Sequence, residues 1–405
     1  MSRSKINSNS PSLVQQHVSC ITTLNTIKQV ANLSPDYKKL VNKMIKLCTI
    51  YSNNISKNPT KYKQFNSNYT IEAIKNYWIK VDRKKPLFVI NNLKPINLKQ
   101  ISSIPIRAGL GSNQLKIQFL NEQGIDAGGP LLDFIQVLMD TLNNYDSNES
   151  SNNIFIPYFN NSSRYKLNVN ISLDKVNELI GSSDKNRFFY IIGSILFFLA
   201  KNGFGIKYPL HRTLLLRLLI RDNEINKNKY EFIYYSYLDN ANINTLVQIL
   251  STDINTNNYT FGPSPDFNDE NDVIDYLFTT AKDQSDFDNP FIKSFIKGFH
   301  MSSKNIYQFF TEKKFGVNDL DYILETSDLS IDSINQILIP QLNITANSHR
   351  NLKIFVKIIK NEVPFPTAAA QNLQTSKPNK KIPKNWKEFM ELLLYYWTGT
   401  KIIQQ

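Results

Sequence analysis

Few residues of this chain could carry covalent or metal chemistry. Its 405 residues include two cysteines, Cys20 and Cys48, and four histidines that lie far apart in the sequence. No C-x-x-C or H-E-x-x-H spacing occurs, so no zinc site is predicted. Both cysteines lie beside apolar residues on predicted helical faces, and no nearby base would lower a thiol pKa. We therefore expect buried, unreactive thiols and neither a metal ion nor another cofactor.

One glycine-rich segment has the character of a structural turn. Residues 124–129 read GIDAGG, between a predicted strand and a predicted helix. This density of glycine indicates backbone angles that other residues resist, and the aspartate can cap the helix. A second segment, Gly109-Leu110-Gly111, lacks the third glycine and the flanking elements of a dinucleotide-binding motif. Neither segment predicts phosphate binding.

Tyrosine is concentrated in residues 229–239, which read KYEFIYYSYLD. We expect that so many tyrosines on one segment do not all point inward. Tyrosine is also enriched at protein-binding surfaces. The segment is therefore a candidate interface, although an aromatic cluster of this kind more often belongs to a core.

Composition and charge limit the class of protein. Apolar residues make up 41% of the chain, which excludes a disordered polyelectrolyte. The 47 lysines and arginines exceed the 34 acidic residues by 13, so an acidic partner such as nucleic acid has to be considered. The polar N-terminus predicts no signal peptide, and the longest apolar run, residues 188–200, is too short for a membrane span. We expect an intracellular protein, cytoplasmic or nuclear, or one carried in a virus particle.

Apolar periodicity predicts a helix-dominated α+β fold with little sheet. A helical leader extends from Ser12 to about Val81, and alternation over residues 115–119 predicts a strand. Pro130 stands where a first helical residue would, and apolar residues follow at helical spacing. Residues 143–163 have the composition of a polar loop. Further helices are predicted over residues 172–180, 187–202, 209–220, 273–282 and 289–301, through Val247 and Leu250, in segments to about residue 338, and from Trp386.

Four stretches occur in a defined order along the chain. The first is LKIQFLNEQGIDAGG with the helix PLLDFIQVLMD, and the second is FFYIIGSILFFLAKNGFGIKYPLHRTLLLRLL. The third is FIKSFIKGFHMSSKNIYQFF, and the fourth is KEFMELLLYYWTGTKII. In this order they resemble segments of the HECT domain, the catalytic module of thioester-forming ubiquitin ligases.

The resemblance implies a HECT N-lobe-like fold with a truncated C-lobe remnant. It divides the chain into a helical leader (1–83), an N-lobe-like domain (84–345) and a partial C-lobe-like segment (346–405). It also matches a structural motif at the opening of the N-lobe, formed by Glu122, Gly124, Asp126, Gly128, Gly129 and Asp133.

The chain departs from the family where the family's chemistry resides. In the family, the cysteine that accepts ubiquitin follows the TG dipeptide that is Thr398-Gly399 here, and this sequence stops at Gln405. Only a thiol can keep the energy of a thioester, so no other side chain can substitute. We therefore expect no catalytic residue. The resemblance then implies a degenerate, pseudo-ligase scaffold that binds a ubiquitin-conjugating enzyme or ubiquitin.

The resemblance also implies where such a partner docks. In the family, the conjugating enzyme occupies an apolar groove formed after the helix that covers residues 209–220 here. We therefore expect the docking surface at Tyr234, Tyr235, Tyr237 and Leu238. Two alternatives stay open: an active HECT-type ligase, completed in trans by a second chain or through Cys48, and a basic structural or nucleic-acid-binding protein on an inherited fold.

Overall fold

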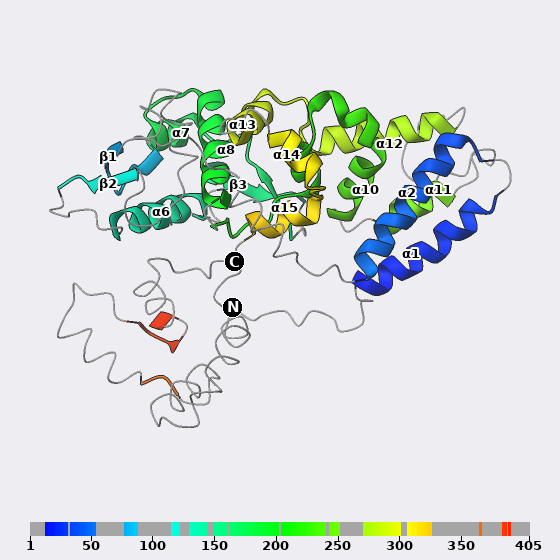
Figure 1. Cartoon of the computed structure of the whole chain (residues 1–405), viewed down its shortest axis with the longest axis horizontal. Coiled ribbons are helices and arrows are strands. Elements are labelled where there is room, and N and C mark those ends of the chain that lie inside the picture. Colours follow the sequence, from blue (N-terminus) through cyan, green and yellow to red (C-terminus); the bar gives the residue numbers. More distant parts are fainter. Residues whose placement is uncertain are drawn as a thin grey trace.

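The described part of the chain is helix-dominated and carries two small sheets, which confirms the predicted α+β class. This computed structural model describes residues 13–30, 33–53, 77–87, 115–121, 129–144, 150–159, 163–201, 204–239, 243–251, 270–300, 306–325, 364–366, 383–386 and 388–389. The elements follow one another from β1, β2 and α6 at one end to α1, α2 and α11 at the other (Figure 1).

The first sheet corrects the predicted extent of the helical leader. Strand β1 (Tyr77–Val81) pairs in parallel with β2 (Leu115–Phe119), with Ile79 opposite Ile117. The prediction of helix up to Val81 was therefore wrong for these five residues. Their sequence, YWIKV, is rich in aromatic and β-branched residues, which pack well on a sheet. The partner strand that stabilises them is distant in sequence, so local periodicity does not reveal it.

The second sheet interrupts a segment predicted to be a polar loop. Strand β3 (Phe155–Pro157) pairs antiparallel with β4 (Tyr165–Leu167), and the short helix η1 (Ser150–Asn152) precedes it. The prediction of a loop over residues 143–163 was therefore wrong for β3 and η1. Phe155 is buried, so the strand belongs to the core despite its polar neighbours.

The helix predicted after the glycine-rich turn is confirmed. Helix α6 (Gly129–Leu142) packs against β2, and its buried face includes Phe134, Leu138 and Leu142. Strand β2 buries Ile117 and Phe119, in agreement with the predicted alternation. The turn between these two elements lies outside the described residues.

A close contact between two glycine-containing helices lies near the middle of the molecule. Helices α8 (Lys185–Lys201) and α13 (Pro290–His300) cross so closely that a Cβ atom on Gly193 would lie 2.1 Å from the Phe295 carbonyl oxygen. A Cβ on Gly298 would lie 2.0 Å from the Tyr190 carbonyl oxygen. The Ser194 hydroxyl also donates to the Gly298 carbonyl at 3.1 Å. Both glycines are therefore required for this backbone approach.

The remaining helices surround this pair. Gly205 follows α8 and lies against the last turn of α15, where the Ile206 amide donates to the Leu324 carbonyl at 2.9 Å. The other helices are α7 (Leu173–Ile180), α9 (Arg212–Leu219), η2 (Asp222–Asn228), α10 (Lys229–Asp239), α11 (Ile243–Ser251), α12 (Glu270–Gln284), α14 (Ile306–Glu312) and α15 (Val317–Leu324).

The two leader helices pack onto the helices that follow α9. Helices α1 (Leu13–Lys28) and α2 (Pro35–Ser52) form a pair that contacts α10, α11 and α12 (Figure 1). The Ser34 amide donates to the Glu270 carboxylate at 2.6 Å, and the Tyr37 hydroxyl donates to the Leu250 carbonyl. The leader therefore shares one hydrophobic core with residues of the predicted N-lobe-like domain.

None of the helices in the described ranges is both long enough and apolar enough to cross a membrane. The apolar run at residues 188–200 belongs to α8, and all of its residues except the partly buried Tyr190 are buried by protein. The run is therefore part of a core helix.

We predict that Gly193→Ala or Gly298→Ala lowers the free energy of unfolding by about 3 kcal/mol. The added methyl group would clash with backbone atoms of the facing helix, which can move away only if the helix itself shifts. Denaturant unfolding followed by circular dichroism measures this loss. Gly316→Ala is the matched control, since its Cβ would have no neighbour nearer than a carboxylate oxygen at 3.6 Å. Equal losses for all three variants would contradict the proposed role of the crossing.

Candidate functional site

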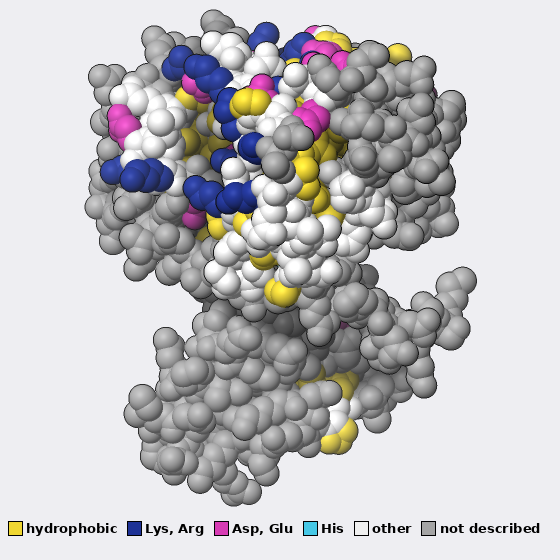
Figure 2. All heavy atoms as spheres, turned by 90° about the vertical axis from the view of Figure 1, so that its right-hand side faces the viewer, with side chains coloured by type: hydrophobic (Ala, Val, Ile, Leu, Met, Phe, Trp, Pro, Cys, Tyr) yellow, Lys and Arg dark blue, Asp and Glu magenta, His cyan; other side chains and the backbone are white. Residues whose placement is uncertain are grey.

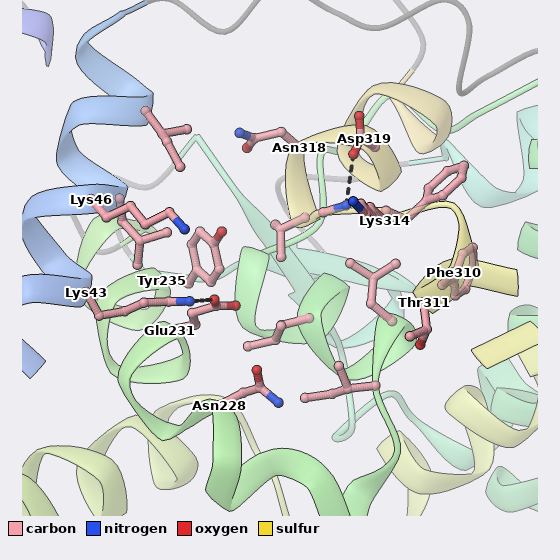
Figure 3. Close-up of a pocket in the computed structure, with 18 residues that line it drawn as sticks. Lys43, Lys46, Asn228, Glu231, Tyr235, Phe310, Thr311, Lys314, Asn318 and Asp319 are labelled. Carbon is pink, nitrogen blue, oxygen red and sulfur yellow. Dashed lines mark hydrogen bonds and ion pairs between the residues drawn. The ribbon is translucent and has the colours of Figure 1, made fainter. Parts of the chain in front are cut away.

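A pocket of about 540 Å³ lies where the leader meets the rest of the helices. Its walls come from α2, from the end of α9, from η2 and α10, and from the segment that joins α14 to α15 (Figure 3). We call it the α2–α15 pocket. This volume is in the range of pockets that hold small molecules or a few side chains of a partner.

The walls of the α2–α15 pocket combine apolar and polar side chains in similar measure. Helix α2 contributes Leu47 and Ile50, which flank one side. The opposite sides are formed by Leu216, Leu219, Ile220, Phe310, Phe315 and Val317. An apolar surface of this kind favours occupation by an apolar group, because its water is released on binding.

Charged residues lie among these walls, and the acidic ones have partners within the chain. Lys43 forms an ion pair with Glu231, and the Asp319 carboxylate accepts a hydrogen bond from the Gly316 amide at 2.8 Å (Figure 3). Lys46 extends from α2 toward Tyr235, and its amine forms no ion pair or hydrogen bond with any residue that the structure describes. Lys46 is therefore a solvent-exposed positive charge at the edge of the pocket, with no ion-pair partner in the described part of the chain.

Tyr235 is the polar group set deepest in the wall. Only 6% of its surface is exposed, and its hydroxyl has no hydrogen-bond partner among the described residues. Burial raises the pKa of this hydroxyl well above its ordinary value, and the proximity of Tyr51 and Glu231 raises it further. It therefore stays protonated at neutral pH and can donate a hydrogen bond into the pocket.

The four residues expected to form a docking surface are all buried. Tyr234, Tyr237 and Leu238 lie at most 7% exposed, and none of them lines the pocket. Tyr234, Tyr235 and Tyr237 all point inward, whereas Tyr230 at the start of α10 is only partly buried, so the expectation that the tyrosines do not all point inward holds for Tyr230 alone. Helix α10 lies between α2, α9, α11 and α12, so three of its faces are covered. Of the four residues, Tyr235 reaches the α2–α15 pocket.

The structural motif predicted at the start of the N-lobe is only partly described. Gly129 begins helix α6, and Asp133 on its first turns pairs with Arg83 at 2.9 Å. Arg83 in turn lies over the Phe119 ring of β2, 3.7 Å from its centroid. Asp133 therefore helps to hold α6 against the sheet. Glu122, Gly124, Asp126 and Gly128 lie outside the described residues.

Both cysteines are buried, as predicted. Burial, with the neighbouring Cys20 thiol, raises the pKa of Cys48 to about 12. Burial also raises the pKa of Cys20, whose thiol donates to the Asn244 side chain at 3.3 Å. At neutral pH both groups are thiols without access to solvent, and neither is suited to attack a thioester.

The histidines that the structure describes have structural contacts. His211 is fully buried, stacks on Tyr158 with ring centroids 4.4 Å apart, and lies 2.5 Å from the Thr213 hydroxyl through Nδ1. His300 lies 2.7 Å from the Leu218 carbonyl oxygen, and burial lowers its pKa to about 4. Within the described ranges, no three His, Cys, Asp or Glu side chains form a group that could hold a metal ion.

A buried ion pair fixes the helices that carry the pocket's inner wall. Asp239 at the end of α10 accepts hydrogen bonds from the Arg212 side chain and from the Arg212 amide at the start of α9. Burial raises the pKa of Asp239, whereas Arg212 and Arg164 act in the opposite direction. Arg212 also lies over the Tyr51 ring of α2, at 5.3 Å. The contacts of Arg212 therefore join α2, α9 and α10.

Positive charge on the described surface is dispersed. On the face over α1, α2, α11 and α12, lysine and arginine side chains stand in separate groups with acidic and apolar side chains between them (Figure 2). Nucleic-acid binding usually uses a continuous basic patch or stripe. The described part of this face therefore offers no specific support for the nucleic-acid alternative.

Several pocket residues could not be selected from the sequence. The leader matches no known pattern, so nothing singled out Lys43, Lys46 and Ile50. Their spacing on one helical stripe is the only available signal, and the same spacing is typical of any solvent-exposed helix face. Residues of the α14–α15 segment gave no signal either.

No protein-family model matches the sequence, and no curated protein matches it significantly. The resemblance to the HECT domain therefore rests on the four stretches of sequence described above.

We predict that neither cysteine reacts with iodoacetamide in the folded protein, because both thiols are buried and protonated. Mass spectrometry after a short labelling pulse should find label only once denaturant is added. A Ser19→Cys variant provides the control, since residue 19 is exposed on α1. Labelling of Cys48 at a rate close to that of the control would contradict the buried position.

We predict that Arg212→Met lowers the free energy of unfolding by about 3–5 kcal/mol, because it removes the guanidinium that pairs with the buried Asp239 carboxylate. The double variant Arg212→Met/Asp239→Leu should recover part of this loss. Urea unfolding of the two variants and of the parent measures the difference. A double variant no more stable than the single one would show that the pair is not the source of the effect.

Proposed function

We propose that this protein is a HECT-like scaffold of the ubiquitin system that binds a ubiquitin-conjugating enzyme, or ubiquitin, without transfer chemistry of its own. The observation that carries the proposal is the α2–α15 pocket. It is a recess at the end of α9 with a partly apolar lining and lysines among its walls, in the region where the resemblance would lead us to expect a docking groove.

The shape and composition of the pocket support binding of a protein partner. Protein interfaces gain most of their energy where a few apolar or aromatic anchors enter well-packed recesses. Leu219, Ile220 and Tyr235 supply such walls from the segment that follows residues 209–220. The proposed docking site thus keeps Tyr235 of the four residues expected from the sequence and adds residues of α2.

The helices that resemble the family also support the proposal. The second and third stretches of the resemblance contain α8 and α13, and the glycine in each of them allows the close crossing. Paired glycines at a helix crossing are a stringent requirement, because any larger residue would separate the backbones. Their presence favours an inherited scaffold over a chance similarity of composition.

The position of Cys48 counts against one alternative, a ligase that uses this residue. Ubiquitin transfer through a thioester requires a thiolate that can reach the partner's thioester carbon. Cys48 is completely buried among α1, α2 and α10, with its pKa raised to about 12. Exposure would require α2 to separate from the core.

A panel of ubiquitin-conjugating enzymes and ubiquitin, tested against the immobilised full chain by biolayer interferometry, examines the proposal. We expect at least one binder, whose affinity falls about tenfold with Ile50→Ser because an apolar wall of the pocket is lost. Val18→Ser is the matched control, since Val18 is a half-exposed apolar residue on α1 outside the pocket.

Two results would overturn the proposal. One is the absence of binding for every member of the panel. The other is a thiol-sensitive ubiquitin adduct on non-reducing gels, which would indicate that the chain performs transfer chemistry.

A further inference from the structure

The α2–α15 pocket holds two polar groups that the packing of the chain does not use. A hydrogen-bonding group at a pocket that no residue of the described part of the chain engages stays available to a ligand. The Tyr235 hydroxyl is one such group, on a side chain that is 94% buried in the pocket wall. The Lys46 amine is the other, on a side chain that is exposed to solvent and extends over the same opening (Figure 3).

The two groups would bind the same kind of ligand group. The Tyr235 hydroxyl is a protonated donor, and the Lys46 amine is a cation with donors only. The acidic residues of the pocket do not fill this need, because Glu231 pairs with Lys43 and Asp319 accepts from Gly316. A group that accepts hydrogen bonds and carries negative charge is therefore the complement.

Carboxylate suits these donors better than phosphate does. Phosphate sites in proteins typically use several arginine forks or a cluster of cations. No arginine lines this pocket, and of its three lysines Lys43 is already engaged with Glu231, while Lys314 also has an interaction within the protein. The apolar walls further require that the anion be attached to an apolar group, as in a protein segment where Asp or Glu adjoins Leu or Phe.

We propose that the α2–α15 pocket recognises an acidic–apolar segment of a partner protein, with an apolar side chain against Ile50 and Leu219 and a neighbouring carboxylate bound by Lys46 and Tyr235. This inference rests on the proposed function only in that the pocket is a docking site for a protein. It does not depend on the partner being a conjugating enzyme.

A pair of short synthetic peptides tests this inference without the natural partner. Both are labelled with fluorescein and carry Phe and Leu as anchors. One has glutamates beside the anchors, and its twin has glutamines there. Fluorescence polarisation with the full chain should show the glutamate peptide binding about fivefold more tightly, since an exposed charge pair contributes modestly.

Two substitutions locate the effect. Lys46→Glu should remove the preference for the glutamate peptide, whereas Lys297→Glu, the same charge change on the exposed face of α13, should leave it unchanged. Tyr235→Phe should weaken the glutamate peptide about tenfold through loss of one charge-assisted hydrogen bond. Tyr237→Phe is the control on the same helix, because Tyr237 is buried outside the pocket.

The outcomes separate this inference from the proposed function. Equal binding of the two peptides, or a preference that survives Lys46→Glu, overturns the carboxylate site even if a conjugating enzyme binds. A glutamate preference that needs Lys46 and Tyr235 supports the site even if no conjugating enzyme binds. Circular dichroism of each variant confirms that its fold is retained, and Tyr235→Phe preserves the ring that packs in the wall.

Discussion

The backbone contact between α8 and α13 is the constraint on which the arrangement of the other helices depends. At Gly193 and Gly298 the two helices approach to a distance that leaves no room for a Cβ atom. Close packing of this kind fixes the relative position of two long buried helices, because protein interiors do not deform continuously. Helix α9 contacts α13, and α15 contacts both α8 and α9, so the position of these helices follows from the crossing. The buried ion pair of Arg212 and Asp239 then relates α9 to α10.

The pocket arises because the leader closes a space that the later helices leave open. Helix α2 rests on α10 through Lys43 and Glu231, and its Tyr51 hydroxyl donates to the Asn318 side chain of α15 at 2.7 Å. These contacts place one wall of the pocket more than 160 residues before the others in the sequence. The leader is thus a part of the candidate site as well as of the core, and its removal would expose Leu219, Tyr235 and the other apolar walls to water.

Periodicity predicted the elements whose stability is local. The helices corresponding to α6, α8, α9, α12 and α13 were found close to their predicted bounds, because each has an apolar stripe that local spacing reveals. Strand β1 was missed because its stability comes from pairing with β2, which local spacing does not report. The exposure of the tyrosines on α10 was misjudged for a related reason. A sequence shows how many faces of a helix are apolar, but the number of neighbours that cover them depends on the tertiary arrangement, and α10 has neighbours on most sides.

The candidate site likewise combines a residue that the sequence indicated with residues that only the tertiary structure brings together. Tyr235 was among the residues selected from the sequence, whereas Lys46 was not, and their functional meaning depends on their proximity. The excess of 13 positive charges in the whole chain first directed attention to nucleic acid. Within the pocket, however, what matters is which charged groups already have a partner in the chain. Glu231 and Asp319 have partners within the chain, as do Lys43 and Lys314, so Lys46 and the Tyr235 hydroxyl are the donors that we propose for an anion. One cation and one donor in an apolar recess favour a carboxylate on an apolar segment over a polyanion, which would require many cations along its length.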